Sequence, residues 1–263
     1  MILKRRVALN GLWLDEIDER IVVTGIKPSD ANENITTTEA AGGYGSRITG
    51  RGRTMLDVIV SFQLMINGRY GDGMQQAAEL LEKVNAWARN GGWLTAAHKP
   101  DRRISVMLAQ APGEDDVFGF GKKEYQLTFR AYGVPYWEQE QERSVTFGGG
   151  NSSGSNGISV DGSAQTQADV VLTNTSGMTI NNATIHVGGK SMSFENLGLG
   201  GGESLTVDHS DGLVRIRIGG RSAMQMRTSS SADDFMINPG GNAVWFSAQR
   251  ACRMTVSWRG RYL

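Results

Sequence analysis

The residue types that could perform acid–base, metal or nucleophilic chemistry are few and widely spaced. The three histidines, His98, His186 and His209, include no pair at metal-ligand spacing. The single cysteine, Cys252, excludes an intrachain disulfide and lies in an alternating run typical of a small core residue. We therefore expect no catalytic residue, no metal site and no cofactor, and we predict that the protein is not an enzyme.

Acidic residues gather in short segments that resemble exposed turns, at residues 15–19, 114–116 and 233–234. Two carboxylates catalyse together only when their surroundings separate their pKa values, and an exposed turn does not do so. None of the three segments has the spacing of an EF-hand calcium loop. They add no candidate site.

Three arginines, Arg47, Arg51 and Arg53, stand among glycines in the segment GGYGSRITGRGR. Such a segment can cradle a phosphate, although a basic loop without a ligand is the favoured interpretation. The 27 Lys and Arg residues balance 27 Asp and Glu residues, so no overall field attracts nucleic acid. The sequence contains no run of about 18 apolar residues, so we predict no membrane insertion. The N-terminal segment does not have the pattern of a signal peptide, because Asn10 and Gly11 and then acidic residues interrupt its apolar stretch.

The clearest predicted strand lies at residues 54–66, where apolar residues recur at every second position. Its opposite face mixes Asp57 and Gln63 with Ile59, and this mixture predicts partial cover by another subunit. We therefore take six residues as candidate interface positions: Arg47, Arg51, Arg53, Asp57, Ile59 and Gln63.

Around this strand the pattern predicts a mainly β domain, residues 1–143, with one covering helix. The helix follows Asp72, a potential cap, and Gly91 and Gly92 supply a left-handed stop. Its apolar stripe comprises Met74, Ala77, Leu81, Val84 and Ala88, with Leu80 and Trp87 beside it. Residues 27–53 are rich in Gly, Thr, Asn and Ser and predict a long loop or an extended arm.

A polar passage separates this domain from the rest of the chain. Pro135 predicts the end of a strand, residues 138–143 are all charged or Gln, and residues 148–157 contain only Gly, Ser and Asn. We interpret residues 144–157 as a Gly/Ser linker. Residues 158–263 contain strand after short strand with no helical period, which predicts an antiparallel β-sandwich domain.

Aromatic residues near the end of the chain suggest a binding function for that sandwich. Trp258 shares its predicted strand face with Cys252 and Met254, so we expect it in the core. Trp245 and Tyr262 remain candidates for stacking against a glycan or a partner. A sandwich fold alone does not choose between a carbohydrate module, a docking domain and a spacer.

An ordered series of segments gives the chain a family resemblance. ATIHVGGK leads to GGESLTVD, FMINPGGN and a final VSWRGRYL in the C-terminal half. In the N-terminal half GGYG and RGR precede the long alternating strand, LTAAHKPDRRISVML follows the helix, and FRAYGVPYWE ends the domain. The series, which spans nearly the whole chain, resembles the distal tail protein family of long-tailed bacteriophages.

This resemblance implies a structural hub at the distal end of a phage, prophage or phage-like tail. Family members form a ring, typically a homohexamer, in which the N-terminal domain builds the ring and meets the tail tube protein. The C-terminal domain, galectin-like in fold, points outward and carries receptor-binding proteins or touches host sugars. A tail-associated lysin or tail fibre protein docks below. The implied location is the virion tail tip, assembled in the cytoplasm of the bacterial host. The alternative is a carbohydrate-binding protein that acts through its sandwich.

Overall fold

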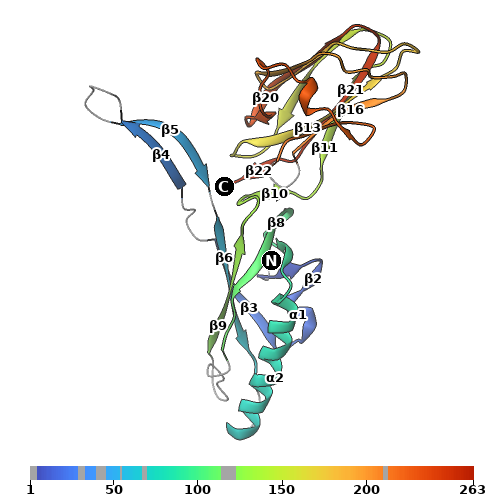
Figure 1. The fold of residues 1–263 in the computed structure, drawn as a ribbon. Helices are drawn as coiled ribbons and strands as arrows, with labels where there is room; N and C mark the ends of the chain where they lie inside the picture. Colours follow the sequence, from blue (N-terminus) through green and yellow to red (C-terminus); the bar gives the residue numbers. More distant parts are fainter. Residues whose placement is uncertain are drawn as a thin grey trace. The chain divides into compact units, whose positions relative to one another are not determined.

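The computed structural model describes residues 5–28, 33–39, 46–53, 55–66, 70–113, 123–209 and 213–263. For residues 33–39, 46–53 and 70–71 it describes the backbone alone. The chain divides into two compact units, Met1–Trp137 and Glu138–Leu263, here called the N-terminal and C-terminal units (Figure 1). Antiparallel strands dominate both, so the predicted mainly β fold is confirmed.

One antiparallel sheet organises the N-terminal unit, with strand order β2-β1-β7-β8-β9-β6-β3. Its strands are β1 (Val7–Leu9), β2 (Leu12–Trp13), β3 (Ile21–Pro28), β6 (Leu56–Leu64), β7 (Gly92–Ala96), β8 (Lys99–Gln110) and β9 (Glu124–Ala131). Along β6 every second residue is buried, from Leu56 to Leu64. The predicted alternation is therefore real, and its apolar face points into the core.

Helix α2 (Tyr70–Ala88) covers the buried face of this sheet (Figure 1). Trp87 meets Phe129 of β9 edge-on, with 6.0 Å between ring centroids. A short helix, α1 (Leu14–Ile17), lies between β2 and β3. The predicted stripe is buried from Ala77 to Ala88, but Met74 is exposed and Asp72 lies inside the first turn rather than at the cap. Gly91 ends the helix in the left-handed region, at φ +61°.

The described part of residues 27–53 is strand throughout, so the expectation of a long loop is wrong there; the other expectation, an extended arm, stays a prediction. Strand β3 continues to Pro28, and β4 (Glu33–Glu39) then pairs antiparallel with β5 (Ser46–Arg53). The β-branched residues in ENITTTE and SRITGRGR favour extended backbone, and a two-stranded ladder satisfies its hydrogen bonds.

Two antiparallel sheets form the C-terminal unit (Figure 1). The larger contains β11 (Arg143–Gly148), β21 (Cys252–Trp258), β13 (Thr166–Asn174), β16 (Ser204–Asp208), β17 (Arg215–Ile218) and β18 (Arg221–Ser222). The smaller contains β12 (Ser153–Val160), β20 (Gly240–Ala248), β14 (Ala183–Val187) and β15 (Lys190–Phe194). Leu172 and Met254 of the first share one core with Ile185 and Phe246 of the second. The predicted β-sandwich is therefore present.

Three short elements complete the unit: β19 (Met236–Ile237), β22 (Arg261–Tyr262) and the 3-10 helix η3 (Met224–Met226). Strand β10 (Trp137–Gln139) begins at the last residue of the N-terminal unit and continues into the C-terminal unit. Cys252 is buried, as expected, and burial raises the pKa of its thiol to about 11. Trp258 is also a core residue.

The structure moves the boundary between the two units and removes the predicted linker. The boundary falls at residues 137–138, and the supposed linker contributes to β11 and β12. At Gly154 a Cβ would lie 2.8 Å from the ring of Phe246. At Gly148, where φ is +83°, it would lie 2.6 Å from the Cys252 carbonyl oxygen. These glycines are therefore required by close packing rather than by flexibility.

The charged run at residues 138–143 belongs to the C-terminal unit because it pairs with the end of the chain. Glu138 and Arg261 form an ion pair of 2.9 Å, with side chains only 12% and 10% exposed. Arg143 pairs with Asp161 at 2.5 Å. The Gln139 N–H donates to the Gly260 carbonyl. A run that resembles a solvated hinge in sequence is therefore fixed in place by partners more than 15 residues away.

Candidate interaction surfaces

The second face of the N-terminal sheet brings three of the predicted interface residues together. Asp57, Ile59 and Gln63 alternate along β6 with the core residues, and all three are half-buried. Across β9, Arg130 lies directly opposite Asp57. We call these four residues, together with Ser61 between them, the β6 outer face.

An ion pair stands at one end of this face. Arg130 donates from Nε to Asp57 Oδ1 at 2.6 Å and from Nη2 to Oδ2 at 2.8 Å. The paired guanidinium lowers the pKa of the Asp57 carboxyl and the carboxylate raises the pKa of Arg130. A two-point contact of this kind fixes both side chains, so the charges are presented in one geometry.

Exposed apolar side chains flank the β6 outer face on both neighbouring strands. Met107 of β8 pairs with Arg130 across the sheet and is 58% exposed. Val22 of β3 pairs with Gln63 and is 40% exposed. Apolar side chains around a fixed ion pair are a composition suited to contact with another protein chain.

The other predicted interface residues, Arg47, Arg51 and Arg53, lie on β5. In register with β4 they stand opposite Thr38, Ile35 and Glu33 respectively. Their side chains lie outside the described part of the structure. Their role in an interface therefore stays a prediction.

An open pocket of about 560 Å³ lies beside the β6 outer face, where β3 meets the start of the chain. Lys27, His98 and Glu124 contribute charged or titratable groups, and the complete lining is Arg5, Thr24, Gly25, Ile26, Lys27, Ser61, His98 and Glu124. Burial, with Lys99 and Arg5 nearby, lowers the pKa of His98. No local pattern in the sequence predicts this pocket, because its residues come from five separate segments.

In the C-terminal unit, Trp245 is part of a stacked aromatic pair that the sequence did not predict. Trp245 of β20 lies opposite His186 of β14, with ring centroids 4.9 Å apart and planes inclined by 9°. Nδ1 of His186 is 2.8 Å from the Ser191 hydroxyl. Burial lowers the pKa of His186 from its ordinary value of 6.5, so the imidazole is neutral at pH 7.

Tyr262, the other predicted stacking residue, lies elsewhere. It belongs to β22, which pairs with β10, whereas Trp245 belongs to the smaller sheet of the sandwich. The structure therefore does not place the two aromatic residues on one sheet face.

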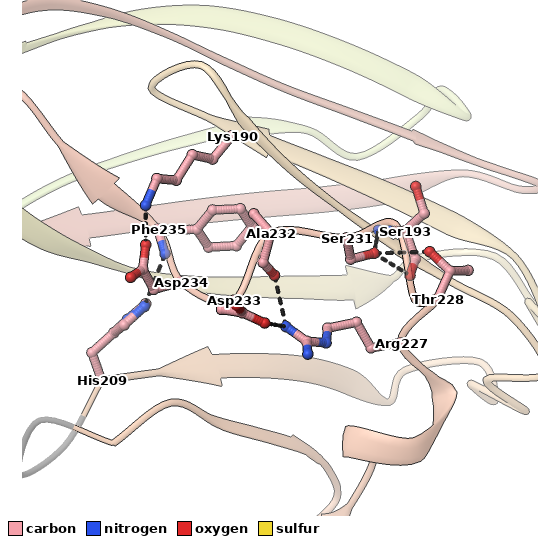
Figure 2. Close-up of polar contacts among 10 residues, drawn as sticks. All are labelled: Lys190, Ser193, His209, Arg227, Thr228, Ser231, Ala232, Asp233, Asp234 and Phe235. Atoms are coloured by element: carbon pink, nitrogen blue, oxygen red, sulfur yellow. Dashed lines mark hydrogen bonds and ion pairs between the residues drawn. The ribbon is translucent and has the colours of Figure 1, made fainter. Parts of the chain in front are cut away.

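A segment of residues 226–235, here called the strap, covers the edge of β15. The N–H of Thr228 donates to the Ser193 carbonyl, and the N–H of Ala232 donates to the Ser191 carbonyl. The Ser231 hydroxyl accepts from the Ser193 N–H at 2.8 Å (Figure 2). This edge of the smaller sheet is therefore satisfied by the chain itself.

The far end of the strap is held by His209, Lys190 and the core residue Phe235 (Figure 2). The Phe235 N–H donates to Nε2 of His209 at 3.1 Å. Nε2 must then accept, so the ring proton lies on Nδ1, which faces Asp169 Oδ1 at 3.1 Å. Lys190 pairs with Asp234. A neutral histidine and an ion pair thus fasten the strap across the two sheets.

Comparison with solved structures identifies the architecture. The crystal structure of the SPP1 Dit protein, described as a paradigm of the hub adsorption apparatus in phages that infect Gram-positive bacteria, matches with a TM-score of 0.67. The match covers 98% of this chain and 99% of the SPP1 Dit chain at 14% sequence identity. This chain has the fold of a phage Dit protein. The likeness extends over both units, so the Dit fold includes the N-terminal sheet as well as the C-terminal sandwich.

Two baseplate chains of phage P2, from structures of the activated conformation with Ca and with Sr, match more weakly. Their TM-scores are 0.42 and 0.39 at 8% and 7% identity, with 99% and 97% of this chain covered. The P2 chains are themselves covered to 98% and 97%. No protein-family model and no curated protein sequence matches the chain.

Two features are absent from the residues that the structure describes. No group of three or more His, Cys, Asp or Glu side chains there is arranged to hold a metal ion. No helix in the same part of the chain is long and apolar enough to cross a membrane.

Proposed function

We propose that this chain is a structural hub at the distal end of a phage, prophage or phage-like tail. It forms a ring that joins the tail tube to the tail tip, baseplate or receptor-binding apparatus. The observation that carries the proposal is the fold shared with the SPP1 Dit protein over essentially the full length of both chains. The proposal assigns no reaction to the chain.

The ring is a homohexamer whose subunits meet through the N-terminal unit. A ring requires a heterologous interface, in which one surface of each subunit contacts a different surface of the next. The β6 outer face suits one side of such a contact, because it combines half-buried Ile59 and Gln63 with the fixed Asp57–Arg130 pair. Met107 and Val22 extend its apolar area.

A ring at the virion tail tip has protein partners on both of its sides. The tail tube protein meets one side of the ring, and a tail-associated lysin or tail fibre protein docks on the other. The C-terminal sandwich is available to receptor-binding proteins. Assembly takes place in the cytoplasm of the bacterial host.

Native mass spectrometry over a range of concentrations tests the ring. We expect a hexamer, or a monomer that closes into hexamers as concentration rises. Ile59→Arg places a charge on the β6 outer face and should shift the population towards monomer without unfolding the chain. Met178→Arg is the matched control, because Met178 is 58% exposed and lies in the C-terminal unit.

If Ile59→Arg forms hexamers as abundantly as the parent protein, β6 is not part of the interface between subunits. A strict monomer at every concentration would overturn the proposed ring itself.

A further inference from the structure

The outward face of the smaller sheet in the C-terminal unit carries a row of side chains in register across all four strands. Ser155 of β12 pairs with Trp245 of β20, Trp245 pairs with His186 of β14, and His186 pairs with Ser191 of β15. Residues directly opposite in an antiparallel ladder share a face. We call this row and its neighbours the Trp245 platform.

Hydroxyl groups and small residues make up the rest of the platform, and it has no formal charge. The rows on either side contribute Ser153, Ser247, Thr184 and Ser193, and Gly157 and Ala243. The Thr184 and Ser193 hydroxyls lie 3.0 Å apart. A single indole is therefore surrounded by hydroxyls, an imidazole and open backbone.

The indole has one covered face and one accessible side. His186 stacks on it from the β14 side, so the opposite face of Trp245 is turned towards β12. The residues there are Ser155 and Gly157, and a Cβ at Gly157 would meet nothing within 4 Å. Trp245 itself is half-buried. This combination leaves open space above Gly157, on the β12 side of the indole.

The chemistry of the platform selects among possible occupants. Protein interfaces concentrate larger apolar side chains at their centre. The large apolar residues found exposed among the described residues all lie outside β12, β14, β15 and β20. The lack of formal charge also disfavours an acidic or basic partner. What fits is a flat ligand with an apolar ring face and hydroxyls around its rim.

We propose that the Trp245 platform binds a neutral sugar ring. The C–H face of the sugar stacks on the open face of Trp245, and its hydroxyls bond to the Ser155 and Ser191 hydroxyls and to Nε2 of His186. The neutral imidazole can donate or accept there, and its Nδ1 is already oriented by Ser191.

The two edges of the sheet determine how a longer glycan would run. The strap covers the β15 edge through its backbone hydrogen bonds to Ser191 and Ser193. At the opposite edge β12 has no further partner strand in the described part of its sheet. An oligosaccharide longer than one ring therefore extends from Trp245 towards and past β12.

This inference concerns the C-terminal unit and does not depend on ring formation. The test uses the full-length chain labelled with 5-fluorotryptophan, observed by fluorine NMR. Its probes are maltotriose, chitotriose and galactotriose, with a trimer of galacturonic acid as the charged comparison. We expect a saturable shift of the Trp245 resonance with at least one neutral trisaccharide, and at least about fivefold weaker binding of the acidic trimer.

Single substitutions distinguish loss of the binding surface from loss of the fold. Gly157→Leu fills the open space beside the indole while leaving both rings in place, and it should abolish the shift. His186→Ala should weaken binding at least about fivefold, the effect of losing one stacking and hydrogen-bonding group. Trp93→Ala, which removes an exposed indole of the N-terminal unit, should leave binding unchanged.

Three results would each overturn the proposal. The first is the absence of any saturable shift with the neutral trisaccharides at concentrations on the order of 10 mM, beyond the usual range of specific affinities. The second is unchanged binding to Gly157→Leu, and the third is equal binding of the acidic trimer. Native mass measured on the same samples shows whether the ring survives, so failure of sugar binding is distinguishable from failure of the hub.

Discussion

Asp57 and Arg130 face each other across β6 and β9 and are joined by two hydrogen bonds, of 2.6 and 2.8 Å. The pair lies on the sheet face opposite the core, beside Ile59. Its geometry is set before any partner binds, so it presents an oriented carboxylate and guanidinium without the entropy cost of ordering two long side chains.

Removing one partner of this pair should cost stability, and exchanging both should restore it. Asp57→Ala leaves the half-buried Arg130 without its carboxylate, so we expect a lower Tm, by a few degrees. The double variant Asp57→Arg with Arg130→Asp keeps the opposite charges and should recover most of the loss. Thermal unfolding followed by circular dichroism checks both. A double variant no more stable than the single one would show that the ion pair itself contributes nothing.

Acid should destabilise the N-terminal unit through Asp18. Arg20 and then Lys83 donate hydrogen bonds to this carboxylate, with Lys83 Nζ at 2.8 Å, and they lower its pKa well below its ordinary value of 3.8. Because the folded-state pKa is the lower one, the stabilisation is complete above about pH 4 and is lost as pH falls further.

The measurement is urea unfolding of the parent protein and Asp18→Asn from pH 7 down to pH 2. We expect the variant to be less stable at pH 7 and the difference to shrink steadily below about pH 4. Glu19→Gln, one residue away, is the control. A difference between parent and Asp18→Asn that stays constant over the whole range would contradict the assignment.

Gly154→Ala should destabilise the C-terminal unit by roughly 1–3 kcal/mol, the usual cost of overpacking a core. The added methyl group would lie 2.8 Å from the ring of Phe246 and 3.2 Å from that of Phe147. Gly157→Ala on the same strand meets nothing within 4 Å and should be neutral or slightly stabilising. Equal unfolding midpoints in urea for the two variants would show that residues 148–157 behave as a linker after all.

Loss of the His209 ring should loosen the strap. His209→Ala leaves the buried Phe235 N–H without its acceptor, at a cost of roughly 1–3 kcal/mol. The local readout is hydrogen exchange of the Phe235 amide, which should accelerate together with the fall in stability. Lys190→Met removes the ion pair with Asp234 but keeps the His209 acceptor, so Phe235 should stay more protected there. Unchanged exchange in His209→Ala would show that the strap is held by other contacts.

Local periodicity was sufficient to predict the elements whose burial repeats along the chain. The alternation in β6 and the stripe from Ala77 to Ala88 in α2 are both visible in sequence because a strand and a helix each present one face to a core. The same reasoning located most strands of the sandwich and placed Trp258 in its core. Glycine-rich β12 was missed, because composition does not distinguish a flexible glycine from one pressed against an aromatic ring.

The partners of each site residue were decided by the tertiary structure. Sequence alone determined that the chain is mainly β, that it has two parts, and that Asp57, Ile59 and Gln63 share one strand face. It could not pair Asp57 with Arg130, Trp245 with His186, or His209 with the Phe235 amide, because these contacts join residues 26 to 73 positions apart. Strand order and register bring such residues together, and they depend on how every inner face packs at once rather than on any local pattern.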